Sequence, residues 1–114
     1  MSTITPSYDL YSELTLKTKE LDTCVKQLRK TGTAYAEAER AYKVLLRAEG
    51  LKLRDDGMAI GMIDKVIYGI PSVAEARFQR DVAEVVYKAN QEAINSIKLQ
   101  MRLIEGQIQR EWQG

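Results

Sequence analysis

Residues suited to binding a phosphate-bearing ligand gather in the middle of the sequence. Arginine presents a planar set of donors that matches phosphate oxygens, and an aromatic ring can stack on a base. One ligand site is therefore expected from these residues and a serine: Arg47, Arg54, Lys65, Tyr68, Ser72, Arg77, Phe78 and Arg80. They predict binding of a phosphate-bearing ligand of nucleotide size.

A salt-bridged surface is the alternative interpretation of the same region. Asp55, Asp56, Asp64 and Glu75 lie among these basic residues and could pair with every one of them. Charged runs are most often solvated faces whose exposed ion pairs add little stability. Phe78 is equally suited to a hydrophobic core.

Catalytic and metal-binding groups are sparse in this sequence. Histidine is absent and Cys24 is the only cysteine, which excludes intramolecular disulfides and zinc sites of the cysteine and histidine kind. Asp81 and Glu84 form the one clean acidic pair at helical spacing, and the neighbouring Arg77 and Arg80 favour an ordinary salt-bridged surface. We therefore expect no enzyme activity, no cofactor and no metal, with Cys24 as a small core residue.

The charge balance and hydropathy limit the classes of partner. The chain has 17 basic and 16 acidic residues, a net charge of +1, and neither half is strongly charged. Strong nucleic-acid binding is disfavoured, because it requires a surface of one sign. No run approaches the ~20 apolar residues that span a bilayer, and the N-terminus does not resemble a signal peptide. These features predict a soluble, cytoplasmic protein without a membrane partner.

The elements that must position the candidate site are helices. Residues 1–6 have no periodicity and are expected to be flexible, and 7–114 are expected to form a single helical domain. A long helix is predicted over about 7–54, in which Thr31-Gly32-Thr33 is a weak bend. Its heptad seam has two rows: Leu14, Leu21, Leu28, Tyr35 and Tyr42, and beside them Leu10, Lys17, Cys24, Thr31, Ala38 and Leu45.

Two further helices follow. Asp55-Asp56-Gly57 is expected to cap a short apolar helix over about 58–68, whose wide apolar face must dock on another element. A capping box of Ser72 and Glu75 predicts the start of a second long helix over about 72–112. Its expected seam consists of two rows: Tyr87, Ile94, Met101 and Ile108, with Val86, Ala93, Ile97 and Ile104 beside them.

The predicted fold is all-α, a long antiparallel helical hairpin with a short connecting helix, self-associating into a bundle. The hairpin would bring the candidate ligand residues to one end of the molecule. Self-association is expected because the second long helix carries apolar residues away from its seam: Val82, Val85, Ala89, Leu99 and Leu103. A monomer whose short helix closes the groove is the alternative.

The middle of the chain resembles a group of small helical phage and prophage proteins. The shared pattern is a break containing arginine and glycine, a short apolar helix ending in glycine, and then Val-Ala-x-x-Arg, an aspartate, a tyrosine and Glu-Ala-Ile. The positions that carry the resemblance are Arg54, Gly57, Gly69, Val73, Ala74, Arg77, Asp81, Tyr87, Glu92, Ala93 and Ile94. The resemblance implies a phage origin and a place in the bacterial host cytoplasm, and it implies no activity.

The functional hypothesis is a non-enzymatic, oligomeric phage accessory protein. We expect it to antagonise host immunity by sequestering a nucleotide-derived signal or a host defence protein. The alternatives are a protein-binding factor in phage DNA replication or recombination and a virion-assembly scaffold.

Overall fold

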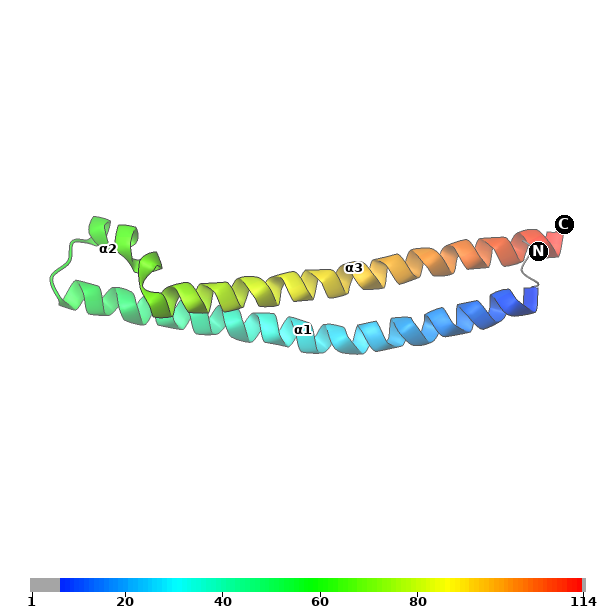
Figure 1. Ribbon diagram of the computed structural model, residues 1–114, viewed down its shortest axis with the longest axis horizontal. Helices are drawn as coiled ribbons and strands as arrows, with labels where there is room; N and C mark the ends of the chain where they lie inside the picture. The colour runs from blue at the N-terminus through cyan, green and yellow to red at the C-terminus, as the bar shows by residue number, and fades with distance from the viewer. Residues whose placement is uncertain (1–6, 114) are drawn as a thin grey trace. The chain divides into compact units, whose positions relative to one another are not determined.

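The computed structural model describes residues 7–113 and shows an all-α chain. The long helices α1 (Ser7–Asp55) and α3 (Pro71–Gln113) are joined through the short helix α2 (Ile60–Val66) and the 3-10 turn η1 (Ile67–Gly69) (Figure 1). The predicted order of a long, a short and a long helix is confirmed. The segment expected to be flexible, 1–6, lies outside the described residues.

Two compact units make up the chain. Unit 1 combines α1 up to Arg29 with α3 from Lys88 onward. Unit 2 is the continuous segment Lys30–Tyr87, which contains the remaining parts of both long helices together with α2 and η1. Within each unit the α1 and α3 segments pack antiparallel, as the predicted hairpin requires (Figure 1).

A heptad seam forms the core of unit 1. Leu10 of α1 is buried, as are Ile94, Ile97 and Ile108 of α3. Ile97 is three residues from Ile94, and Ile108 is fourteen residues from it, so all three lie on one face of α3. The α1 residues of the predicted seam in this unit are half-buried: Leu14, Lys17, Leu21, Cys24 and Leu28.

One polar contact interrupts this apolar seam. The Asn90 side-chain amide of α3 donates a hydrogen bond of 3.0 Å to the main-chain carbonyl of Cys24 in α1. Because Asn90 occupies the same row of positions as Ile97 and Ile104, this bond fixes which residues of α1 lie opposite it. The expected placement of Cys24 inside the seam is consistent with its half-buried side chain.

The core of unit 2 is formed by three elements. Tyr42 of α1, Ile63 of α2, Ile67 of η1 and Val73 of α3 are buried against one another. Burial of each such isoleucine contributes about 1.5–3 kcal/mol, so α2 and η1 are anchored through these two side chains. The docking predicted for the short helix is therefore confirmed. Partly buried residues complete the cluster: Leu45, Leu46, Leu53, Met58, Ile70 and Ala76.

Helix α1 ends in a Schellman motif. Gly57 has a φ of 91°, the Gly57 amide donates to the Arg54 carbonyl, and the Met58 amide donates to the Leu53 carbonyl. A left-handed residue at this position reverses the chain and satisfies the last carbonyls of the helix. The expectation that Asp55-Asp56-Gly57 caps the short helix was wrong: α2 has Ala59 at its N-cap, with no side-chain hydrogen bond.

The start of α3 differs from the predicted capping box. Ile70 is extended and Pro71 is the first helical residue, so the helix begins before Ser72. Proline is well suited to this position, because its fixed φ matches the helix and its missing N–H would have no partner there. Glu75 instead accepts a hydrogen bond of 2.9 Å from the Gln79 side chain. Ser72 therefore does not cap the helix.

Gly32 lies inside the uninterrupted helix α1 and serves as a packing notch. A Cβ atom at this position would lie 3.1 Å from Cε1 of Tyr87, closer than ordinary van der Waals contact. The Tyr87 ring also stacks on Tyr35, with centroids 5.9 Å apart and an interplanar angle of 30°. The absence of a side chain at Gly32 thus gives the Tyr87 ring its place against α1.

Candidate functional site

A hollow of about 360 Å³ lies between the end of α1 and α2 in unit 2. We call it the α1–α2 hollow. Arg47, Gly50, Leu51 and Arg54 line it from α1, and Ile60, Ile63 and Asp64 line it from α2. The α1 residues share one side of the helix because they are spaced by three, four and seven positions.

Arg47 and Arg54 are the two cations of this hollow. Both side chains are exposed, and among residues 7–113 neither makes a hydrogen bond or an ion pair. Their Cα atoms are one heptad apart, which corresponds to about 10.5 Å along the helix axis. Asp64 brings one acidic group to the same hollow and is likewise without an ion pair in the described chain. The hollow therefore combines two unpaired guanidinium groups with one carboxylate.

The predicted residues nearest to this hollow in sequence lie outside its lining. Lys65, Tyr68 and Ser72 are exposed. The Arg77 guanidinium lies over the Tyr68 ring, with Cζ 5.3 Å from the ring centroid. This cation–π contact covers one face of the ring that we expected to stack on a ligand.

Arg80 is also engaged within the protein. Its Cζ lies 4.7 Å from the Tyr42 ring centroid, and its guanidinium pairs with Asp81 at 2.8 Å. The hydrogen bond with Asp81 raises the Arg80 pKa further. Arg80 occupies the inner face of α3, on the same heptad row as Val73 and Tyr87, so it points toward α1.

Polar contacts surround Tyr35, and the sequence did not predict them. Burial is the largest cause of a raised Tyr35 pKa, followed by the negative charges of Glu39 and Glu84 and a hydrogen bond with Glu84. Tyr35 was assigned to the seam as an apolar residue, and the spacing that placed it there was correct. Glu39, four positions along α1, and Glu84 of α3 were the residues from which these polar contacts could have been predicted.

Phe78 lies on the outer face of α3, away from the α1–α2 hollow. Together with Val82, Val85 and Val86 it lines a shallow apolar hollow, which we call the α3 patch. The exposed fractions of these four side chains are 59%, 42%, 67% and 49%, in the same order. The prediction that Val82 and Val85 lie off the seam is confirmed, whereas the placement of Val86 beside the seam was wrong.

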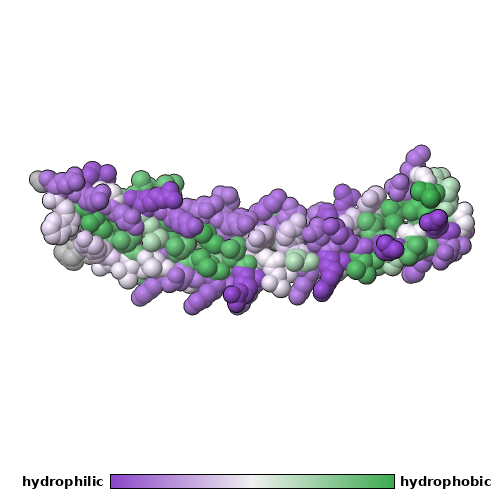
Figure 2. All heavy atoms as spheres, turned by 180° about the vertical axis from the view of Figure 1, so that it is seen from behind, coloured by the Kyte–Doolittle hydropathy of each residue, from purple (hydrophilic) through white to green (hydrophobic). Residues whose placement is uncertain are grey.

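Hydrophobic side chains are exposed elsewhere in unit 2 as well. On the face drawn in Figure 2 they gather over the α2 end of this unit. The exposed members in α2 are Ile60, Met62 and Val66, of which Ile60 also lines the α1–α2 hollow. Unpartnered apolar area of this kind is typical of an interaction surface.

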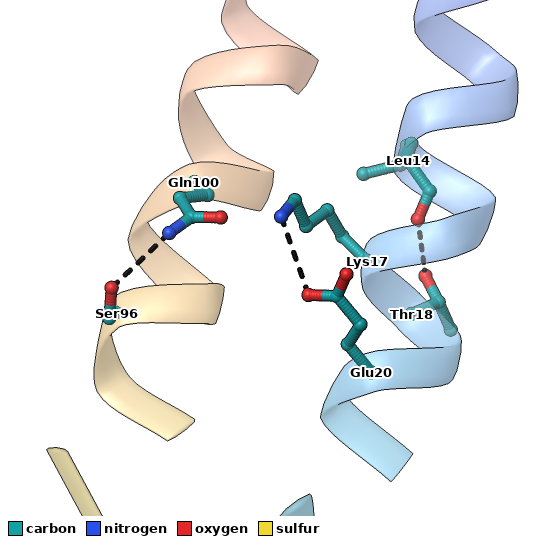
Figure 3. Close-up of polar contacts among 6 residues, drawn as sticks. All are labelled: Leu14, Lys17, Thr18, Glu20, Ser96 and Gln100. Atoms are coloured by element: carbon teal, nitrogen blue, oxygen red, sulfur yellow. Dashed lines mark hydrogen bonds and ion pairs between the residues drawn. The ribbon is translucent and has the colours of Figure 1, made fainter. Parts of the chain in front are cut away.

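Unit 1 has a hollow of its own between α1 and α3, of about 470 Å³. Figure 3 shows Lys17 and Gln100 facing each other across the two helices. The Lys17 ammonium pairs with Glu20 at 3.3 Å, and the Gln100 amide donates to the Ser96 hydroxyl. Lys17, the charged residue of the predicted seam, therefore has an ion-pair partner on its own helix. The other lining residues are Glu13, Leu16, Leu103 and Ile104.

Between residues 7 and 113, no three histidine, cysteine, aspartate or glutamate side chains are grouped so as to hold a metal ion. None of the helices in that range combines the length and apolar character that crossing a bilayer requires.

Known proteins give no indication of the function of this chain. No family model matches the chain, and neither a curated protein nor a solved structure shows significant similarity to it.

Proposed function

We propose that this chain is a binding protein that assembles with copies of itself through the α3 patch, in the phage accessory setting that the resemblance implies. The observation that carries the proposal is the contiguous apolar surface of Phe78, Val82, Val85 and Val86 on the outer face of α3. Complete burial of one valine contributes about 1.5–3 kcal/mol, so this surface is a substantial source of association free energy.

The spacing of the patch suits a helical partner. Phe78, Val82 and Val85 are separated by four and three residues, which is the interval that a coiled-coil seam needs. A second copy of α3 offers the same interval. In an antiparallel pairing about a two-fold axis, Val82 of each copy lies opposite Val85 of the other, so both valines are covered by one symmetric contact.

The overall charge supports a second copy as the partner. With a net charge of +1, two copies carry almost no mutual electrostatic repulsion. Asp81 is the one charged residue that lines the patch, and it is already paired with Arg80 on its own helix. Self-association therefore does not bury an unpaired charge at this position.

Substitution of Val85 by lysine tests the proposed assembly. Val85 is the most exposed side chain of the patch, so the folded hairpin tolerates Val85→Lys while a dimer would bury the new charge. We expect the dissociation constant measured by sedimentation equilibrium to increase at least about tenfold. Val44→Lys is the matched control, because Val44 is a valine of α1 in the same unit with 64% exposure.

Two results would contradict this function. One is a wild-type chain that sediments as a monomer at millimolar concentration. The other is an assembly that Val44→Lys disrupts as strongly as Val85→Lys does, since that would move the interface away from the α3 patch. Circular dichroism of both variants confirms that each remains helical.

A further inference from the structure

We propose that the α1–α2 hollow is an anion site that holds a phosphate-bearing small molecule between Arg47 and Arg54. The proposal goes beyond self-assembly, because a single copy supplies every residue that lines the hollow. It rests on two guanidinium groups that face one hollow without a protein partner.

Neither arginine of the hollow is neutralised by an ion pair within the described chain. Asp55, Asp56, Asp64 and Glu75 were the reason to expect a salt-bridged surface. None of them pairs with Arg47 or Arg54 among residues 7–113. An incoming phosphate would therefore displace only water from the two guanidinium groups. Arginine is well suited to this contact because it can present two parallel N–H donors to two phosphate oxygens.

A glycine separates the two arginines in the lining of the hollow. Gly50 lies between them in the lining and contributes no side chain. A Cβ atom added at this position would lie 3.4 Å from Ile67, which is an ordinary van der Waals contact. A glycine inside a helix costs about 1 kcal/mol relative to alanine, and no close packing contact at Gly50 offsets that cost. Gly50 therefore adds no side chain to the lining between Arg47 and Arg54.

The rest of the lining combines apolar side chains with one carboxylate. Leu51, Ile60 and Ile63 provide an apolar wall, beside which a charge-assisted hydrogen bond is stronger than in open water. Asp64 adds an acceptor to the same hollow. A simple polyphosphate would be repelled by this carboxylate, whereas a ligand that combines phosphate with N–H donors would satisfy it. The favoured class is thus a nucleotide, and guanine offers a carboxylate two adjacent donors.

Calorimetry with GDP and with inorganic pyrophosphate tests this site. We expect GDP to bind more tightly than pyrophosphate, and Arg47→Gln or Arg54→Gln to weaken both ligands at least about tenfold. Asp64→Asn should strengthen pyrophosphate binding, because a repelling charge is removed, and should reduce the preference for GDP. These side chains are exposed, so the substitutions leave the core intact.

Arg40 supplies a control for bulk charge. It lies one heptad before Arg47 on the same side of α1, is exposed, and is outside the lining of the hollow. Arg40→Gln removes the same charge and should leave both affinities unchanged. The proposal is overturned if neither ligand gives heat at millimolar concentration, or if Arg40→Gln weakens binding as much as Arg47→Gln. Either result leaves the test of assembly by Val85→Lys unaffected.

Discussion

At the scale of single residues, Tyr35 has the most distinctive environment in unit 2. Its ring stacks on Tyr87, and its hydroxyl group is close to the carboxylates of Glu39 and Glu84. Burial and these charges oppose ionisation, so the pKa of Tyr35 lies above its ordinary value of 10.0. The neutral phenol is therefore favoured in the folded chain relative to the unfolded one.

The pH dependence that follows has a definite sign. A group whose pKa is raised by folding stabilises the native state fully below its unfolded pKa, and this contribution is lost as the pH rises through the folded pKa. We expect the free energy of unfolding to fall above pH 10. Tyr35→Phe should make this fall shallower and should remove a step from the most alkaline part of the tyrosinate absorbance titration. Tyr11→Phe is a control at an exposed tyrosine; an equal change in both variants would contradict the assignment.

The residues of the predicted ligand site also illustrate what spacing alone determines. Consecutive helical residues are about 100° apart, so Arg80 and Phe78, two positions apart, face nearly opposite sides of α3. Arg80 accordingly lies on Tyr42, whereas Phe78 is 59% exposed in the α3 patch. Sequence could place both residues near the connector. It could not show which arginines would find partners inside the protein, because that depends on side chains brought from other helices.

At the scale of elements, the heptad pattern was the part of the sequence that predicted structure best. The row from Leu10 to Leu45 and the row from Leu14 to Tyr42 are buried or half-buried at every position within their respective units. Helix ends were predicted less well, since the same residues can serve several capping patterns. Ser72 and Glu75 matched a capping box, yet Pro71 begins the helix and Glu75 pairs with Gln79.

The hydrogen bond between Asn90 and Cys24 leads to a prediction about the seam of unit 1. Asn90→Ala removes a partly buried bond of 3.0 Å, which should lower the free energy of unfolding by about 1 kcal/mol in urea. Asn90→Leu should be more stable than Asn90→Ala, because it fills the seam position with apolar volume while the Cys24 carbonyl keeps its helical bond. Asn95→Ala, at an exposed position of the same helix, should change stability by less than about 0.5 kcal/mol. Equal losses for Asn90→Ala and Asn95→Ala would show that the bond contributes nothing.

At the scale of the whole molecule, the sequence predicted the helical class and the hairpin connectivity but not the division into two units. The division depends on which contacts form between distant parts of the chain, and the heptad phase carries no information about it. The excess of apolar residues on α3 could be recognised from sequence, because positions off the seam are defined once the seam is known. The structure was needed to show which apolar residues form one surface, as Phe78, Val82, Val85 and Val86 do.

The two units differ in the sequence separation of the segments that they bring together, and this difference affects the order of folding. Unit 2 is one uninterrupted stretch, Lys30–Tyr87, whereas unit 1 joins the beginning of the chain to its end. Unit 2 closes a smaller loop than unit 1 does, and a smaller loop costs less chain entropy. Unit 2 should therefore fold first, and the α1 and α3 segments of unit 1 should pack together afterwards. Pulse-labelled hydrogen exchange should then protect the amides of Tyr42 and Ala76 before those of Ile97 and Ile108. The opposite order of protection would exclude this route.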